Sequence, residues 1–72
     1  MIIEECVLEL KLGDHIDRNI DELWDQSLPW ETHIKSLDYS HITRVIFNSK
    51  TGGTAIYFSD PEYKTWFIVM YS

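Results

Sequence analysis

Carboxylates repeat every four residues in the segment DHIDRNIDELWDQSL, which contains Asp17, Asp21 and Asp25. A helix turns about 100° per residue, so a helix here would place these three side chains along one flank of its apolar stripe. Paired carboxylates carry out general acid–base catalysis when burial raises the pKa of one of them. On a helix surface they are instead exposed neighbours of like charge, which cost roughly a few tenths of a kcal/mol per pair. The stripe is therefore not explained by local helix stability, and its pattern does not favour catalysis.

The other reactive side chains also lack the spacing of a catalytic or metal site. The three histidines, His15, His33 and His41, show no metal-ligand spacing among themselves or with the single Cys6. Cys6 falls on the apolar side of an alternating segment, which is typical of a buried thiol. The TGG of residues 51–53 lacks the Lys-Ser/Thr and the helix of a phosphate-binding loop. We therefore expect no metal, no cofactor and no enzymatic activity.

Negative charge is concentrated in the first half of the chain. The 72 residues have a net charge of −6. Residues 1–38 contain ten acids against three bases, a net charge of −7, whereas residues 39–72 have a net charge of +1. Such a one-sided field is compatible with simple solubility, disfavours direct nucleic-acid binding and favours a basic partner. The N-terminus does not resemble a secretory signal, and the apolar runs are too short to span a bilayer, so we expect a cytoplasmic protein.

Apolar periodicity predicts the elements that position these side chains. Residues 2–12 alternate between apolar and polar, which is typical of a half-buried strand. After Gly13, apolar residues recur at helical spacing and predict a helix over about 16–28. Residues 29–38 fit either a short second helix or a packed loop.

The second half of the chain is rich in β-forming residues. HITRVIFN (41–48) and TAIYFS (54–59) are separated by SKTGG, which predicts a hairpin. The sequence SDPEYK then predicts a turn, followed by a last strand over 65–71. That strand would be apolar on both faces, so either residues 29–38 cover its second face or apolar surface remains for a partner. The expected fold is a single α+β domain over 1–72. Its small antiparallel sheet, an N-terminal strand plus a three-strand meander, would pack against one acidic helix.

The C-terminal segment SDPEYKTWFIVMYS resembles the corresponding segment of the bacteriophage inhibitors of uracil-DNA glycosylase of the Ugi type. In that family a Ser-Asp turn and Pro-Glu-Tyr-Lys precede a Trp that opens an apolar strand. The hairpin sequence SHITRVIFNSKTGG fits the same order, so the likeness covers residues 40–72 and is most specific in 59–66. The order of strand, acidic helix and meander is also shared.

The resemblance implies a protein that mimics DNA and occupies the basic groove of a host uracil-DNA glycosylase in a 1:1 complex. Carboxylates would stand in for phosphates, and a pocket would capture the apolar side chain that the enzyme pushes into the duplex. The acidic contacts would be Glu5, Glu9, Asp17, Asp21, Glu22 and Asp25, with Glu9 matching the family's key glutamate. The apolar pocket would draw on Ile20, Leu23, Trp24, Val45, Phe47, Ile56 and Phe58, any of which could instead be a core residue.

Two other classes of function remain open. An acidic phage protein or antitoxin-like module could block a different basic host protein. A small enzyme is the least favoured class, because it would need a reactive His or Cys6.

Overall fold

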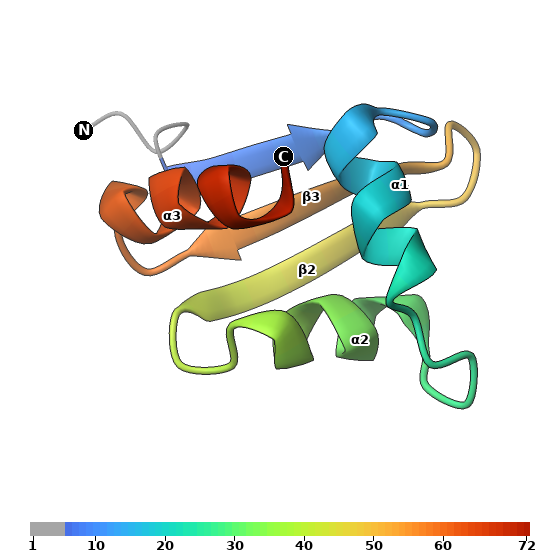
Figure 1. Ribbon diagram of the computed structural model, residues 1–72, viewed down its shortest axis with the longest axis horizontal. Coiled ribbons are helices and arrows are strands. Elements are labelled where there is room, and N and C mark those ends of the chain that lie inside the picture. Colours follow the sequence, from blue (N-terminus) through green and yellow to red (C-terminus); the bar gives the residue numbers. More distant parts are fainter. Residues whose placement is uncertain (1–5) are drawn as a thin grey trace.

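In residues 6–72, three strands and three helices follow one another in the order β1, α1, α2, β2, β3, α3 (Figure 1). The structure is a computed structural model, and it describes residues 6–72. The elements are β1 Val7–Leu10, α1 His15–Glu22, α2 Trp30–Leu37, β2 Ile42–Asn48, β3 Gly53–Phe58 and α3 Pro61–Tyr71. The expected α+β class is confirmed, and among the described residues no helix is long and apolar enough to cross a membrane.

The strands form an antiparallel sheet in the order β1-β3-β2, so the N-terminal strand pairs with the second arm of the hairpin. Glu9 pairs with Ala55, which pairs with Ile46 on its other side. Between Ile42 and Arg44 the register of β2 shifts by one residue. Such a bulge reverses the inward and outward alternation, and it lets Ile42 and the later Val45 both join the core.

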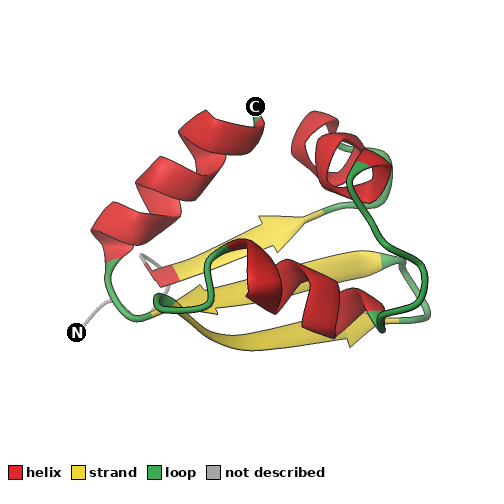
Figure 2. Ribbon diagram, turned by 60° about the horizontal axis from the view of Figure 1, so that its bottom comes forward, coloured by secondary structure: helices red, strands yellow, loops and turns green. Residues whose placement is uncertain are grey.

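All three helices lie on one face of the sheet (Figure 2). Ile20 of α1, Ile34 of α2 and Ile56 of β3 have no exposed surface, and Phe67 of α3 packs with them. Alternate strand residues point to the other face, which none of the three described helices covers. There the side chain of Glu9 is exposed.

The last element is a helix, and the prediction of a strand over 65–71 was wrong. Asp60 caps α3 by accepting a hydrogen bond from the backbone N–H of Glu62 at 3.0 Å, and Pro61 occupies the first turn, where its missing N–H costs nothing. Tyr63 and Phe67, one helical turn apart, face the core. The meander therefore has two strands instead of three, because a short apolar run alone does not distinguish a strand from a buried helix.

The first helix is shorter than the expected 16–28, since α1 ends at Glu22 and turns follow. In the turn at Asp25, the backbone N–H of Ser27 donates to the Asp25 carboxylate at 3.0 Å. Asp25 is therefore not on the same helix as Asp17 and Asp21. For residues 29–38, left open by the sequence, the structure has a helix, α2, which begins directly after Pro29.

The predicted hairpin is confirmed, with a turn between β2 and β3. Gly52 has a φ of +75°, a left-handed conformation that favours glycine. A Cβ placed on Gly52 would lie 2.9 Å from a methyl carbon of Leu12. The hairpin turn therefore touches the loop between β1 and α1, and this contact holds together two loops that border the candidate site.

Candidate functional site

A groove lies between α1, the start of α2 and the tip of the β2–β3 hairpin. Its cavity volume is about 460 Å³. We call it the α1 groove, and it is lined by Leu12, Gly13, Asp17, Arg18, Asp21, Trp24, Trp30, Glu31, Phe47 and Gly52. It contains four residues that the sequence assigned to a partner-binding site: Asp17, Asp21, Trp24 and Phe47.

Aromatic rings and a leucine form the apolar wall of the groove. Trp24 and Trp30 pack edge to face, with ring centroids 5.0 Å apart. Phe47 on β2 is 42% exposed and Leu12 is 72% exposed, so both offer apolar surface to a partner. Exposed apolar side chains gathered at one groove are typical of an interaction site, whereas scattered ones are normal.

Carboxylates dominate the charged lining of the groove. Asp21 and Glu31 are exposed, and Asp17 adds a third acid against the single base Arg18. Because α1 and α2 each contribute an exposed acid, the negative charge lies on both sides of the tryptophan pair. The arrangement suits an apolar side chain that projects from a positively charged surface.

Asp17 differs from the other acids because it is nearly buried, with 7% of its surface exposed. Its carboxylate accepts a hydrogen bond from the backbone N–H of Gly13 at 3.2 Å. Gly13 has a φ of +85°, so this bond stabilises a turn that only glycine adopts easily. The geometry gives Asp17 a structural role at the start of α1, and the exposed carboxylate of α1 in the groove is that of Asp21.

Three of the residues expected in the apolar pocket are core residues instead. Ile20 and Ile56 have no exposed surface and Phe58 is 4% exposed, so a partner cannot reach them. Val45 is half-buried against the same core. Leu23 is 61% exposed but does not line the groove.

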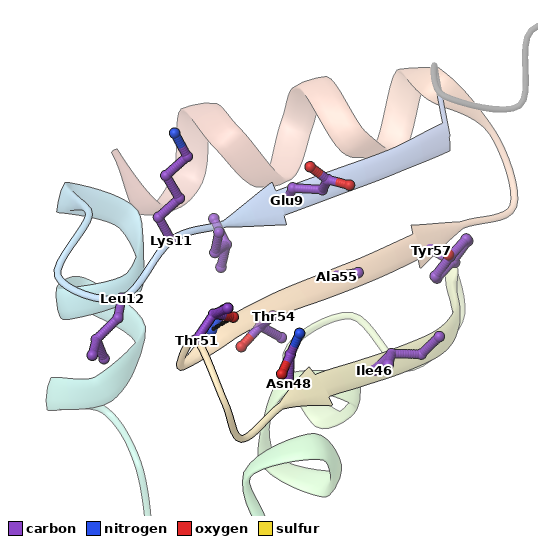
Figure 3. A pocket seen from close by; sticks show the side chains of 11 residues that line it. Glu9, Lys11, Leu12, Ile46, Asn48, Thr51, Thr54, Ala55 and Tyr57 are labelled. Atoms are coloured by element: carbon purple, nitrogen blue, oxygen red, sulfur yellow. Dashed lines mark hydrogen bonds between the residues drawn. The ribbon is translucent and has the colours of Figure 1, made fainter.

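Glu9 lies on the opposite face of the sheet from α1. Figure 3 shows its side chain on β1, beside Ala55 of β3 and with Ile46 of β2 across a hollow of about 660 Å³. The structure therefore does not bring Glu9 and Asp21 onto one face. The two hollows meet at Leu12, which lines both. Glu5 lies outside the described residues.

Glu22 and Asp25 are exposed but lie outside the groove lining. The carboxyl group of Asp25 has a pKa below its ordinary value of 3.8. The main cause is the backbone hydrogen bond from Ser27, followed by one from the Ser27 hydroxyl, and nearby His33 acts in the same direction. Asp25 is therefore ionised at neutral pH and adds to the negative field around the end of α1.

Sequence reasoning missed Leu12, Trp30 and Glu31 as groove residues. Trp30 and Glu31 follow Pro29 in the segment left open between helix and loop, and only the position of α2 brings them beside Trp24. The expected strand over residues 2–12 includes Leu12, but β1 ends at Leu10 and Leu12 lies in the following loop. Leu12 is exposed because it lies beyond the end of β1.

Buried His33 lies next to both tryptophans of the groove. It is 4% exposed, and its Nε2 lies 3.1 Å from the carbonyl oxygen of Ile20, which makes Nε2–H the donor to that oxygen. Its ring lies 5.8 Å from Trp30 and 6.5 Å from Trp24, measured between centroids. The histidine thus links α2 to α1 beneath the tryptophan pair.

Within residues 6–72, no three His, Cys, Asp or Glu side chains lie close enough to hold a metal ion. Comparison of this chain with protein-family models, with curated proteins and with solved structures finds no match.

Proposed function

We propose that this chain is a protein-binding module that blocks a basic, DNA-binding protein of a host cell by occupying its DNA site, and that the target is a uracil-DNA glycosylase. The α1 groove would be the contact surface. An apolar side chain of the target would enter between Leu12, Trp24, Trp30 and Phe47, and basic residues around it would pair with Asp21 and Glu31.

The single observation that supports this proposal is the combination of apolar walls and carboxylates in one groove. Burying a leucine-sized side chain contributes roughly 2 kcal/mol, and complementary charge raises the association rate. A DNA-binding surface supplies both partners, since it is basic and, in enzymes that push a residue into the duplex, also has a projecting side chain. The activity would take place in the cytoplasm of an infected cell and would need no cofactor.

The choice of a glycosylase rests on the sequence resemblance in residues 59–66. The fold supports this choice only in part. A strand followed by an acidic helix and a hairpin agrees with the resemblance, but SDPEYKTWFIVMYS forms α3 where the resemblance implies a strand. The acidic groove does not depend on that segment, because none of its lining residues comes from α3.

The helical C-terminus favours a second candidate, in which the same groove blocks a different basic host protein. This alternative keeps the chemistry of the α1 groove and changes only the target. It predicts binding that weakens with salt, as the first candidate does, but no effect on uracil excision.

An excision assay separates the two candidates. Purified glycosylase acting on uracil-containing DNA should lose its activity when this protein reaches about an equimolar amount. Full activity at a large excess of the protein would exclude the glycosylase as target. Retention of a basic DNA-binding protein other than the glycosylase, lost on Asp21→Lys, would then support the second candidate.

A further inference from the structure

A third hollow lies between the end of α2 and α3, and it is lined mainly by aromatic residues. Its volume is about 300 Å³. Tyr63, Trp66 and Tyr71 come from α3, with Phe67 beneath them, and Leu37 and Asp38 come from the end of α2. Trp66 is 61% exposed and Met70 beside it is 65% exposed, so the hollow is open to solvent on the α3 side.

One acid among the described residues lines this hollow, and a neighbour holds it in place. Asp38 Oδ1 lies 2.8 Å from Nδ1 of His41, and 28% of the Asp38 side chain is exposed. The ring of His41 stacks on Tyr63, with centroids 3.5 Å apart. The carboxylate is therefore oriented by a histidine that is itself fixed against one aromatic wall, and it still has surface available to a ligand.

Two helices end at this hollow. α2 ends at Leu37 and α3 ends at Tyr71, and both residues line it. The C-terminal end of a helix has a partial negative charge, which favours cations. The last turn of α2 contains Lys35, whereas the last turn of α3 contains no basic residue. The end of α3 and the carboxylate of Asp38 are therefore the negative groups of this hollow.

A titratable group on the wall responds to this potential. The pKa of Tyr71 is raised above its ordinary value of 10.0, first by burial and then by the negative charge of Asp38. The field of Asp38 thus acts on another wall of the same hollow, where it disfavours a second negative charge.

We propose that this hollow binds the arginine side chain of a partner protein, with the guanidinium against Trp66 and hydrogen-bonded to Asp38. Aromatic faces attract cations, and the planar guanidinium both stacks on rings and pairs with a carboxylate. A purely apolar ligand would cover Asp38 without replacing its hydrogen bonds to water, and an anion would be repelled. The charge complementarity is local, because the carboxylate of Asp38 and the C-terminal end of α3 both favour a cation. The site is separate from the α1 groove and does not depend on the identity of the target proposed above.

Titration of the isotope-labelled protein with two blocked tripeptides, Gly-Arg-Gly and Gly-citrulline-Gly, tests the proposal. Citrulline keeps the shape of arginine but lacks its charge. The arginine peptide should shift the NMR signal of the Trp66 indole N–H in a saturable way, and the citrulline peptide should bind at least about fivefold more weakly. The indole signals of Trp24 and Trp30 belong to the other groove and should not move.

Two variants locate the charge. Asp38→Asn keeps the side-chain shape and should weaken arginine binding by about fivefold, whereas Glu62→Gln, on α3 but outside the hollow lining, should have no effect. Equal binding of the two peptides, no shift of Trp66 with either, or unchanged binding in Asp38→Asn would each overturn the proposal. The peptide comparison uses the unaltered protein, so it tests the proposal even if a variant does not fold.

Discussion

Trp24 and Trp30 pack edge to face across the connection between α1 and α2, with ring centroids 5.0 Å apart and an interplanar angle of 72°. Each indole N–H is also fixed. Trp24 donates to the carbonyl of Leu28 and Trp30 donates to the hydroxyl of Thr54, both at 3.0 Å. The apolar wall of the α1 groove is thus held in place without a partner, which lowers the entropic cost of binding.

Replacing Trp30 by Phe tests the hydrogen bond from the Trp30 indole to the buried hydroxyl of Thr54. Thr54 is 3% exposed, so loss of the indole N–H leaves its hydroxyl without a donor and should reduce the free energy of unfolding by about 1–2 kcal/mol. Trp24→Phe is the matched control, because the bond to Leu28 is exposed and water can replace it. Chemical denaturation measures both variants. An equal loss of unfolding free energy in Trp30→Phe and Trp24→Phe would contradict the role assigned to Thr54.

Gly52→Ala should destabilise the hairpin tip more than Gly13→Ala destabilises the loop before α1. Both glycines have positive φ, so either substitution costs roughly 1–2 kcal/mol of backbone strain. Only at Gly52 does the added Cβ also meet a side chain, that of Leu12, whereas nothing lies within 4 Å at Gly13. Thermal unfolding of the two variants gives the difference. A smaller loss of stability in Gly52→Ala than in Gly13→Ala would contradict this prediction and would show that the Leu12 side chain moves aside freely.

The helical cap of α3 is tested by Asp60→Ala and Asp60→Asn. Alanine removes the acceptor for the N–H of Glu62 and should cost about 1 kcal/mol, whereas asparagine keeps an acceptor and should cost a few tenths, since the two caps are of about equal strength. Denaturant midpoints measure the stabilities, and Cα chemical shifts report whether residues 61–71 are helical. Strand-like shifts in the unaltered protein would contradict α3 itself.

The pKa of Asp25 should rise toward 3.8 in Ser27→Ala, but only part of the way. The substitution removes the hydroxyl donor and leaves the backbone donor, which is the larger cause of the depression. A depressed carboxyl pKa contributes stability above the unfolded-state value, and this stability is lost as the pH falls through the lower folded-state value. The variant should therefore lose less stability on acidification below about pH 4. NMR titration of the carboxyl carbon measures the pKa. Ser49→Ala, in the hairpin turn, is the control and should leave the pKa of Asp25 unchanged. An equal rise of the Asp25 pKa in Ser49→Ala would contradict the assignment of the lowered pKa to Ser27.

The parts of the fold that are fixed by local pattern could be predicted from the sequence. Alternation around Leu8 and Leu10, and two β-rich runs joined by Gly52 and Gly53, correctly predict β1 and the hairpin. The WFIVMY run could not be assigned by periodicity, because the outer face of α3 is apolar as well. The Asp60-Pro61-Glu62 start was the available sign of a helix, and it was interpreted as a turn.

The candidate site could be predicted only where its residues lie on one element. Asp21 and Trp24 are close in sequence and both line the α1 groove. Leu12 and Trp30 join them only through the contact of the hairpin tip and the position of α2. The sequence could not show that Ile20 and Ile56 join one core, because that depends on how α1 packs against the sheet.

The most direct test of the proposed function is the dissociation constant of the complex with uracil-DNA glycosylase for the unaltered protein and for two charge reversals. Asp21→Lys places a positive charge in the α1 groove, and Glu62→Lys makes the same change on exposed α3 outside it. The proposal predicts tight binding by the unaltered protein. It also predicts at least about tenfold weaker binding by Asp21→Lys, and little change for Glu62→Lys. Equal effects of the two reversals, or no binding by the unaltered protein, would contradict it.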